Sequence, residues 1–146
     1  MKFIENDKFI FFSNYNSPKA NAFDKHNQIC ALFFWQSINI QIRIKGEVYK
    51  TSREFNKEYF KKRSKSKNAL AISSNQSQVI SDFNQIKLKY DDVKDNSNLS
   101  ECPDYWGGFY FIPYSFEFWK GNDFRINRRD LYKKQIKGWD HFILEP

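Results

Sequence analysis

A strict alternation of isoleucine and polar residues in the first third of the chain constrains the fold most. Isoleucine occupies positions 38, 40, 42 and 44, and the residues between and after them are Asn39, Gln41, Arg43 and Lys45. Successive side chains of a β-strand point to opposite faces, so this period of two predicts a half-buried antiparallel strand. One face would pack on a core, and the face with Gln41 would meet solvent or a ligand.

Further segments fit the same sheet. Buried strands are predicted at 8–13 and at 29–35, the second a continuous apolar run, and further strands around 108–112, 115–119, 125–133 and 138–144. Ser17 and Pro18 predict a helix to about His26. A capping box of Thr51 and Glu54 predicts a helix to about Arg63, and Ser81 a helix to about Val93. We expect a mainly β, α+β fold: one antiparallel barrel-like domain spanning 1–146, with 103–146 packed as part of it.

Several classes of protein conflict with the sequence. No apolar run of about eighteen residues exists to span a membrane, and acidic residues follow Met1 too closely for a signal peptide. We therefore expect a cytoplasmic protein. The net charge of +7 leaves a basic nucleic-acid-binding domain as a minor alternative.

Standard catalytic arrangements are absent. His26 and His141 lack metal-ligand spacing, the five glycines form no phosphate loop, and Cys102 has no second ligand set. Cys30 lies in an apolar run, where we expect a buried thiol. No metal is predicted.

The polar residues near the predicted strand ends suit an anionic aromatic ligand. Lys, Arg and Ser bind phosphate, Gln binds ring edges, and Trp stacks on rings. The candidates are Ser13, Lys19, Gln41, Gln76, Ser77, Arg125 and Arg129, with Trp119 beside them; Trp106 is interpreted as core.

Six motifs, in the same order along the chain, resemble those of one known protein family. Residues 11–20, F-F-S-N-Y-N-S-P-K-A, resemble the F-Y-T-N-x-x-S-R-K-A segment of pyridoxamine 5′-phosphate oxidases. Residues 106–109 and 113–121, W-G-G-F and P-Y-S-F-E-F-W-K-G, are similar to W-G-G-[FY] and P-x-x-I-E-F-W-Q-G. Residues 125–129, R-I-N-R-R, stand where the family has R-L-H-D-R, and L-E-P at the end resembles L-A-P. Gln41 and the pair at 76–77 fall in matching order.

The resemblance implies an FMN-binding split barrel and a homodimer with flavin sites at the subunit interface. It implies oxidation of pyridoxamine or pyridoxine 5′-phosphate to pyridoxal 5′-phosphate with O2 as acceptor. The flavin contacts carried over are Phe12, Ser13, Lys19, Gln41, Gln76, Ser77, Trp119 and Arg129. The substrate contacts are Lys2, Tyr59, Arg63 and Lys67, with Arg125 over the substrate ring and Asn127 beside it in the catalytic motif.

The chain also departs from the family pattern. Pro18 replaces an arginine, Lys67 replaces a serine, and Asn127 replaces a histidine. The family motif R-x-V-L-L-K matches only at its last two positions, by Met1 and Lys2, so we expect the first barrel strands and a phosphate-binding arginine to be missing. A degenerate relative that binds FMN or a phosphorylated ligand without oxidase activity is therefore the alternative function.

Overall fold

The structure is a computed structural model that describes residues 1–146. Its strands are β1 (Phe3–Glu5), β2 (Lys8–Asn14), β3 (Gln28–Trp35), β4 (Ile40–Lys50), β5 (Trp106–Lys120), β6 (Arg128–Lys134) and β7 (Trp139–Leu144). The helices are α1 (Pro18–Lys25), α2 (Arg53–Lys62), α3 (Lys65–Ser73) and α4 (Asn84–Asn96), with a 3₁₀ turn η1 (Gln36–Ile38). No helix is both long and apolar enough to cross a membrane.

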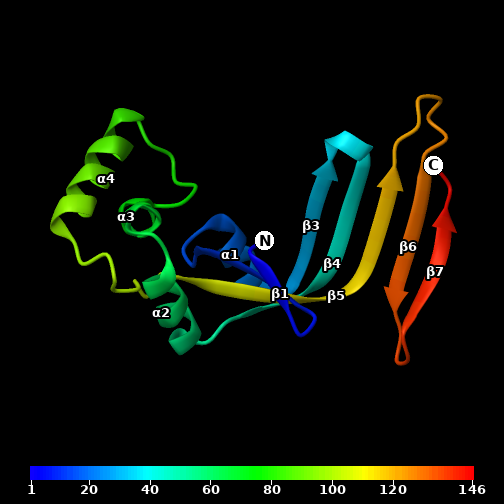
Figure 1. The fold of residues 1–146 in the computed structure, drawn as a ribbon, viewed down its shortest axis with the longest axis horizontal. Helices are drawn as coiled ribbons and strands as arrows, with labels where there is room; N and C mark the ends of the chain where they lie inside the picture. Colours follow the sequence, from blue (N-terminus) through cyan, green and yellow to red (C-terminus); the bar gives the residue numbers. More distant parts are fainter. The chain divides into compact units, whose positions relative to one another are not determined.

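The strands form one sheet. They hydrogen-bond in the order β1-β2-β5-β4-β3, and β6 pairs with both β5 and β7. Figure 1 shows β3, β4, β5, β6 and β7 lying side by side. The pairs β3–β4, β5–β6 and β6–β7 are antiparallel. The chain divides into two compact units. Unit 1 comprises 1–3, 10–26 and 49–110, and unit 2 comprises 4–9, 27–48 and 111–146.

Short polar signals start the helices of unit 1. Ser17 caps α1 by accepting a hydrogen bond from the Ala20 N–H, and Pro18 occupies the first turn, as predicted. The predicted capping box at α2 is wrong by one residue, because Ser52 caps this helix through the Phe55 N–H. The Thr51 hydroxyl lies instead 2.6 Å from Asn56 Oδ1 and 3.0 Å from the Gly108 carbonyl oxygen, so tertiary contacts engage it.

Three other predicted boundaries are corrected. Helix α3 was not predicted, because its lysine-rich start reads as the solvated end of α2. Helix α4 begins at Asn84 rather than beside Ser81 and runs to Asn96. The strands predicted at 108–112 and 115–119 are one continuous strand, β5, which Pro113 does not interrupt.

The core of unit 1 is aromatic. Phe60, Cys102 and Trp106 are buried together, and Phe12 and Tyr59 pack against them. Trp106 is therefore core, as predicted, although it also faces a charged side chain described below.

Unit 2 confirms the alternating strand. Ile42 and Ile44 in β4 are buried, while Gln41 and Arg43 are only half-buried on the other face. The strand predicted at 29–35 is present as β3, but its predicted burial is wrong: Phe34 is 55% exposed and the Cys30 thiol is exposed. Strand β3 ends the strand order and pairs only with β4, and its Leu32, Phe34 and Trp35 side chains are exposed.

Candidate functional site

Three predicted flavin contacts meet where β2 leads into α1. The Lys19 ammonium donates to Ser13 Oγ over 3.2 Å, and the Ser13 hydroxyl donates to Gln76 Oε1 over 3.0 Å. Ser13 Oγ also lies 3.3 Å from the hydroxyl of Ser17, the α1 cap. A phosphate accepts hydrogen bonds from groups of these kinds: a lysine ammonium, hydroxyls and the N–H groups at the start of a helix. The Lys19 side chain is exposed, so an anion can reach it.

Gln76 is fixed by more than one strand residue. Its Oε1 accepts a second hydrogen bond, 2.9 Å long, from the Asn14 N–H. The next residue, Ser77, is exposed and has a left-handed backbone with φ of 67°. The structure thus brings Gln76 to Ser13 across 63 positions of sequence, and Ser77 follows it in the turn.

A second group in unit 1 is built on stacked rings. Phe12 stacks on Tyr59 with ring centroids 3.9 Å apart and planes 7° apart, and on Trp106 at 5.1 Å. The Arg63 guanidinium lies 4.5 Å from the centroid of the Trp106 ring. The ring of Phe12, which was predicted to contact flavin, is thus covered by Tyr59 and Trp106. Arg63 contacts the same aromatic cluster through Trp106.

Arg63 lacks the partner that a buried cation normally has. Its Nη1 is buried without a hydrogen-bond partner, and its Nη2 donates only to the Lys67 carbonyl oxygen over 3.3 Å. Burial lowers the pKa of Arg63, and no carboxylate offsets this. A half-buried guanidinium with a free donor is suited to bind an anion such as a phosphate monoester.

Unit 2 holds the remaining predicted flavin contacts on one face of its strands. Trp119 in β5 is the cross-strand partner of Arg129 in β6. Arg129 donates to Glu117 Oε1 from Nε over 3.0 Å and from Nη2 over 2.9 Å. Glu117 Oε2 accepts a short hydrogen bond from Arg43 Nη2. Gln41 lies on the same face of β4 as Arg43, two residues away.

The predicted substrate-ring residues lie in the turn between β5 and β6. Arg125 has a left-handed backbone with φ of 63°, and its carbonyl oxygen accepts from the Asn127 N–H. Asn127 Oδ1 accepts from the Asn122 N–H over 3.0 Å, so this side chain holds the turn together. Lys2 and Lys67 are exposed, and the backbone carbonyl of Lys67 accepts the hydrogen bond from Arg63.

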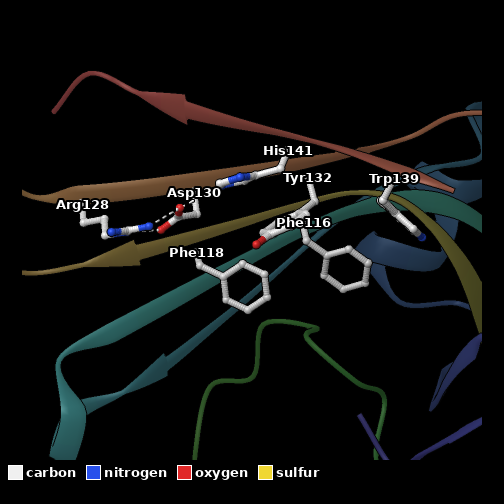
Figure 2. Close-up of a pocket in the computed structure, with 7 residues that line it drawn as sticks. All are labelled: Phe116, Phe118, Arg128, Asp130, Tyr132, Trp139 and His141. Atoms are coloured by element: carbon white, nitrogen blue, oxygen red, sulfur yellow. Dashed lines mark hydrogen bonds and ion pairs between the residues drawn. The ribbon is translucent and has the colours of Figure 1, made fainter.

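A large pocket of unit 2 contains none of the predicted residues. It has a volume of about 580 Å³ and lies on the face of β5 opposite Glu117 and Trp119 (Figure 2). Its charged groups satisfy one another, because Arg128 and His141 both contact the Asp130 carboxylate. The rest of the lining is Phe116, Phe118, Tyr132 and Trp139. With no free buried donor, this pocket is not the candidate site.

Three residues of these groups were missed in the sequence. Trp106 faces Arg63, while Glu117 pairs with both Arg129 and Arg43. A usable signal existed for Glu117, which is a lone carboxylate among aromatic residues and shares the strand parity of Trp119.

Both parts of the chain match family models. Residues 1–97 match the model described as pyridoxamine 5′-phosphate oxidase, and residues 106–146 match the pyridoxine 5′-phosphate oxidase C-terminal dimerisation region. A pyridoxine/pyridoxamine 5′-phosphate oxidase of Leptospira interrogans is 32% identical over 149 residues, covering 100% of this chain and 70% of that protein. The protein of the same name in Christiangramia forsetii is 36% identical and is covered to 69%, again with 100% of this chain.

Solved structures share the fold. PhzG of Burkholderia lata, solved with tetrahydrophenazine-1-carboxylic acid, has a TM-score of 0.86 at 22% identity, over 99% of this chain and 72% of PhzG. A pyridoxamine 5′-phosphate oxidase-related, FMN-binding protein of Nostoc punctiforme has a TM-score of 0.73 at 13% identity, over 100% and 77%. These likenesses confirm the predicted fold class, an antiparallel split barrel with peripheral helices.

Proposed function

Because the chain belongs to the pyridoxamine 5′-phosphate oxidase family, we propose that it is an FMN-dependent oxidase of pyridoxamine and pyridoxine 5′-phosphates, with O2 as the acceptor. The product would be pyridoxal 5′-phosphate. The family and the names of the relatives support an oxidoreductase of this type, and the substrate and acceptor are our proposal.

The guanidinium of Arg63, with its unpartnered Nη1, is the observation that supports a phosphorylated substrate. Its buried Nη1 has no protein partner, and it lies in the same aromatic cluster as Tyr59. A substrate phosphate would supply the missing acceptor, and Lys67 one turn along would add a second cation. Lys2, Arg125 and Asn127 are proposed to contact the rest of the substrate, Arg125 at its ring.

The residues present fit FMN. The Ser13–Lys19 donor group at the start of α1 is proposed to hold its phosphate, with Gln76 and Ser77 beside it. The remaining contacts with FMN would come from Gln41, Trp119 and Arg129. Phe12 would contribute through its backbone. Bound FMN would supply the redox chemistry, passing two electrons from the substrate to O2, which would be reduced to hydrogen peroxide. The protein's own residues would bind, orient and screen the reactants.

We further propose a homodimer in which flavin binds at the subunit interface. The match of residues 106–146 to a dimerisation region supports it. Exposed apolar side chains on β3, among them Leu32 and Phe34, support it as well, because such side chains gain most from burial against a partner.

The test is to purify the chain and load it with FMN. The proposal expects a flavin absorption spectrum, and formation of pyridoxal 5′-phosphate and peroxide from pyridoxamine 5′-phosphate in air. Protein that takes up no FMN at high excess would refute it. Protein that binds FMN but forms no product would instead favour the degenerate relative, which the uncharged Asn127 and the missing arginine at Pro18 also favour.

A further inference from the structure

Glu117 lies between two arginines. It is 8% exposed and comes from β5, whose neighbours β4 and β6 supply Arg43 and Arg129. Strand alternation places it on the face of Trp119, away from Phe116 and Phe118. It is thus a buried carboxylate on the strand face that carries three of the proposed flavin contacts.

Glu117 and the C-terminal residues fix the Arg129 guanidinium from two sides. Nε and Nη2 of Arg129 donate to one oxygen of Glu117, and Nη1 donates to the Glu145 carbonyl oxygen over 2.9 Å. These three hydrogen bonds define the plane of the guanidinium. One N–H on each terminal nitrogen remains for a ligand.

The group keeps a net positive charge. Burial would raise the pKa of Glu117, but the hydrogen bonds from Arg43 and Arg129 outweigh it, so the pKa lies below its ordinary value and the carboxylate is ionised at neutral pH. Two guanidinium groups and one carboxylate leave one excess positive charge. Arg43 Nε is buried without a partner, so the group also retains a free donor.

We propose that Glu117 is a positioning residue for flavin binding: it holds Arg129, and with it Arg43, in the orientation that binds the cofactor. The inference rests on the proposed function. Glu117 itself, a carboxylate, would make no favourable contact with an anionic ligand. It acts by preventing the two arginines from repelling each other and from adopting other rotamers.

Removing the negative charge of Glu117 distinguishes a positioning role from a purely electrostatic one. If Glu117 mattered only through its charge, its removal would make the site more positive and would strengthen the binding of the FMN dianion. If it positions Arg129, its removal weakens binding despite the more favourable net charge. The substitution Glu117→Gln separates the two, because glutamine has nearly the same shape and no charge.

The first measurement needs no ligand. In a ¹H–¹⁵N spectrum of arginine side chains, the Arg129 Nε–H is expected to be slowly exchanging in the wild type and to broaden in Glu117→Gln, with Arg129→Lys providing the assignment. Asp24→Asn is the matched control, because Asp24 pairs with Lys50 in an exposed ion pair of unit 1 and should leave this signal unchanged. An unchanged Arg129 signal in Glu117→Gln refutes the positioning role.

The second measurement is FMN affinity, followed by quenching of flavin fluorescence. Glu117→Gln is expected to bind FMN at least about tenfold more weakly. Glu117→Asp should recover part of the loss, and Asp24→Asn should bind as the wild type does. In an Arg129→Gln background, Glu117→Gln should cause little further loss, because the residue on which it acts is gone.

The outcomes separate this inference from the proposed function. A wild type that fails to bind FMN refutes the proposed function, and the ligand-free spectrum still decides whether Glu117 orders Arg129. Equal or tighter FMN binding by Glu117→Gln, or full additivity with Arg129→Gln, refutes the positioning role while leaving the function intact. If Glu117→Gln fails to fold, Glu117→Asp carries both measurements, and an unchanged signal with unchanged affinity there refutes the role.

Discussion

Replacing Arg63 by methionine tests whether its half-buried charge exists for a ligand or for the fold. Methionine keeps an unbranched side chain against the Trp106 ring and removes the guanidinium. Three contributions to stability change. Removing the unpartnered buried Nη1 abolishes a desolvation penalty of about 1–3 kcal/mol. Loss of the cation–π contact costs about 1–2 kcal/mol, and loss of the hydrogen bond to the Lys67 carbonyl about 0.5–1 kcal/mol.

These contributions oppose one another, so we expect the free energy of unfolding to change by less than about 1 kcal/mol. Binding of a phosphate should change far more. A hydrogen bond to a charged group contributes about 1.5–3 kcal/mol, so affinity should fall about 10- to 150-fold. Denaturant unfolding measures the first quantity and calorimetric titration the second.

The ligand pair for the titration is 4-deoxypyridoxine with and without its 5′-phosphate, since this analogue carries a methyl group in place of the C4′ alcohol or amine that would be oxidised. Only the phosphorylated form should lose affinity in Arg63→Met. Lys62→Met is the control, because it removes an equal charge from an exposed neighbouring position. Equal losses for both ligands, or destabilisation beyond about 2 kcal/mol, would show that Arg63 serves the fold instead.

Three further predictions concern stability. Ser17→Ala should lower stability by about 1 kcal/mol in thermal unfolding, because the cap of α1 is lost, whereas Ser64→Ala should not, since Ser64 makes no cap hydrogen bond. Gly107→Ala should cost about 1–3 kcal/mol, because its Cβ would lie 2.5 Å from Asn56 Nδ2; a stability equal to the wild type would contradict this packing. Hydrogen bonds from Arg128 and His141 lower the pKa of Asp130 from 3.8 to about 2, so its stabilisation is complete above about pH 4 and is lost as pH falls through 2. Asp130→Asn should therefore lose less stability than the wild type between pH 4 and pH 2 in acid titration followed by circular dichroism.

Local patterns were sufficient for much of the fold. The alternation around Gln41 predicted a half-buried strand, and Ser17–Pro18 predicted the start of α1, because both signals depend on neighbouring residues only. The predicted helix boundaries failed where a tertiary contact competed. Thr51 carries the same capping signal as Ser52, but its hydroxyl faces Asn56 and Gly108.

Burial could not be predicted from local pattern in β3. An apolar run such as 29–35 is buried only when another layer covers it, and Phe34 remains largely exposed within this chain. The length of β5 could not be predicted locally either. Its pairing with strands from distant parts of the sequence keeps the backbone extended through residues 113 and 114.

The motifs in the sequence by themselves determined the family and the residue types available for phosphate and flavin. Only the tertiary structure decided how those residues pair. It placed Gln76 on Ser13, left Arg63 Nη1 without a partner, and set Glu117 between Arg43 and Arg129. The physical reason is that residue type fixes which donors and acceptors exist, whereas the meeting of strands far apart in sequence fixes which of them are satisfied within the protein and which remain for a ligand.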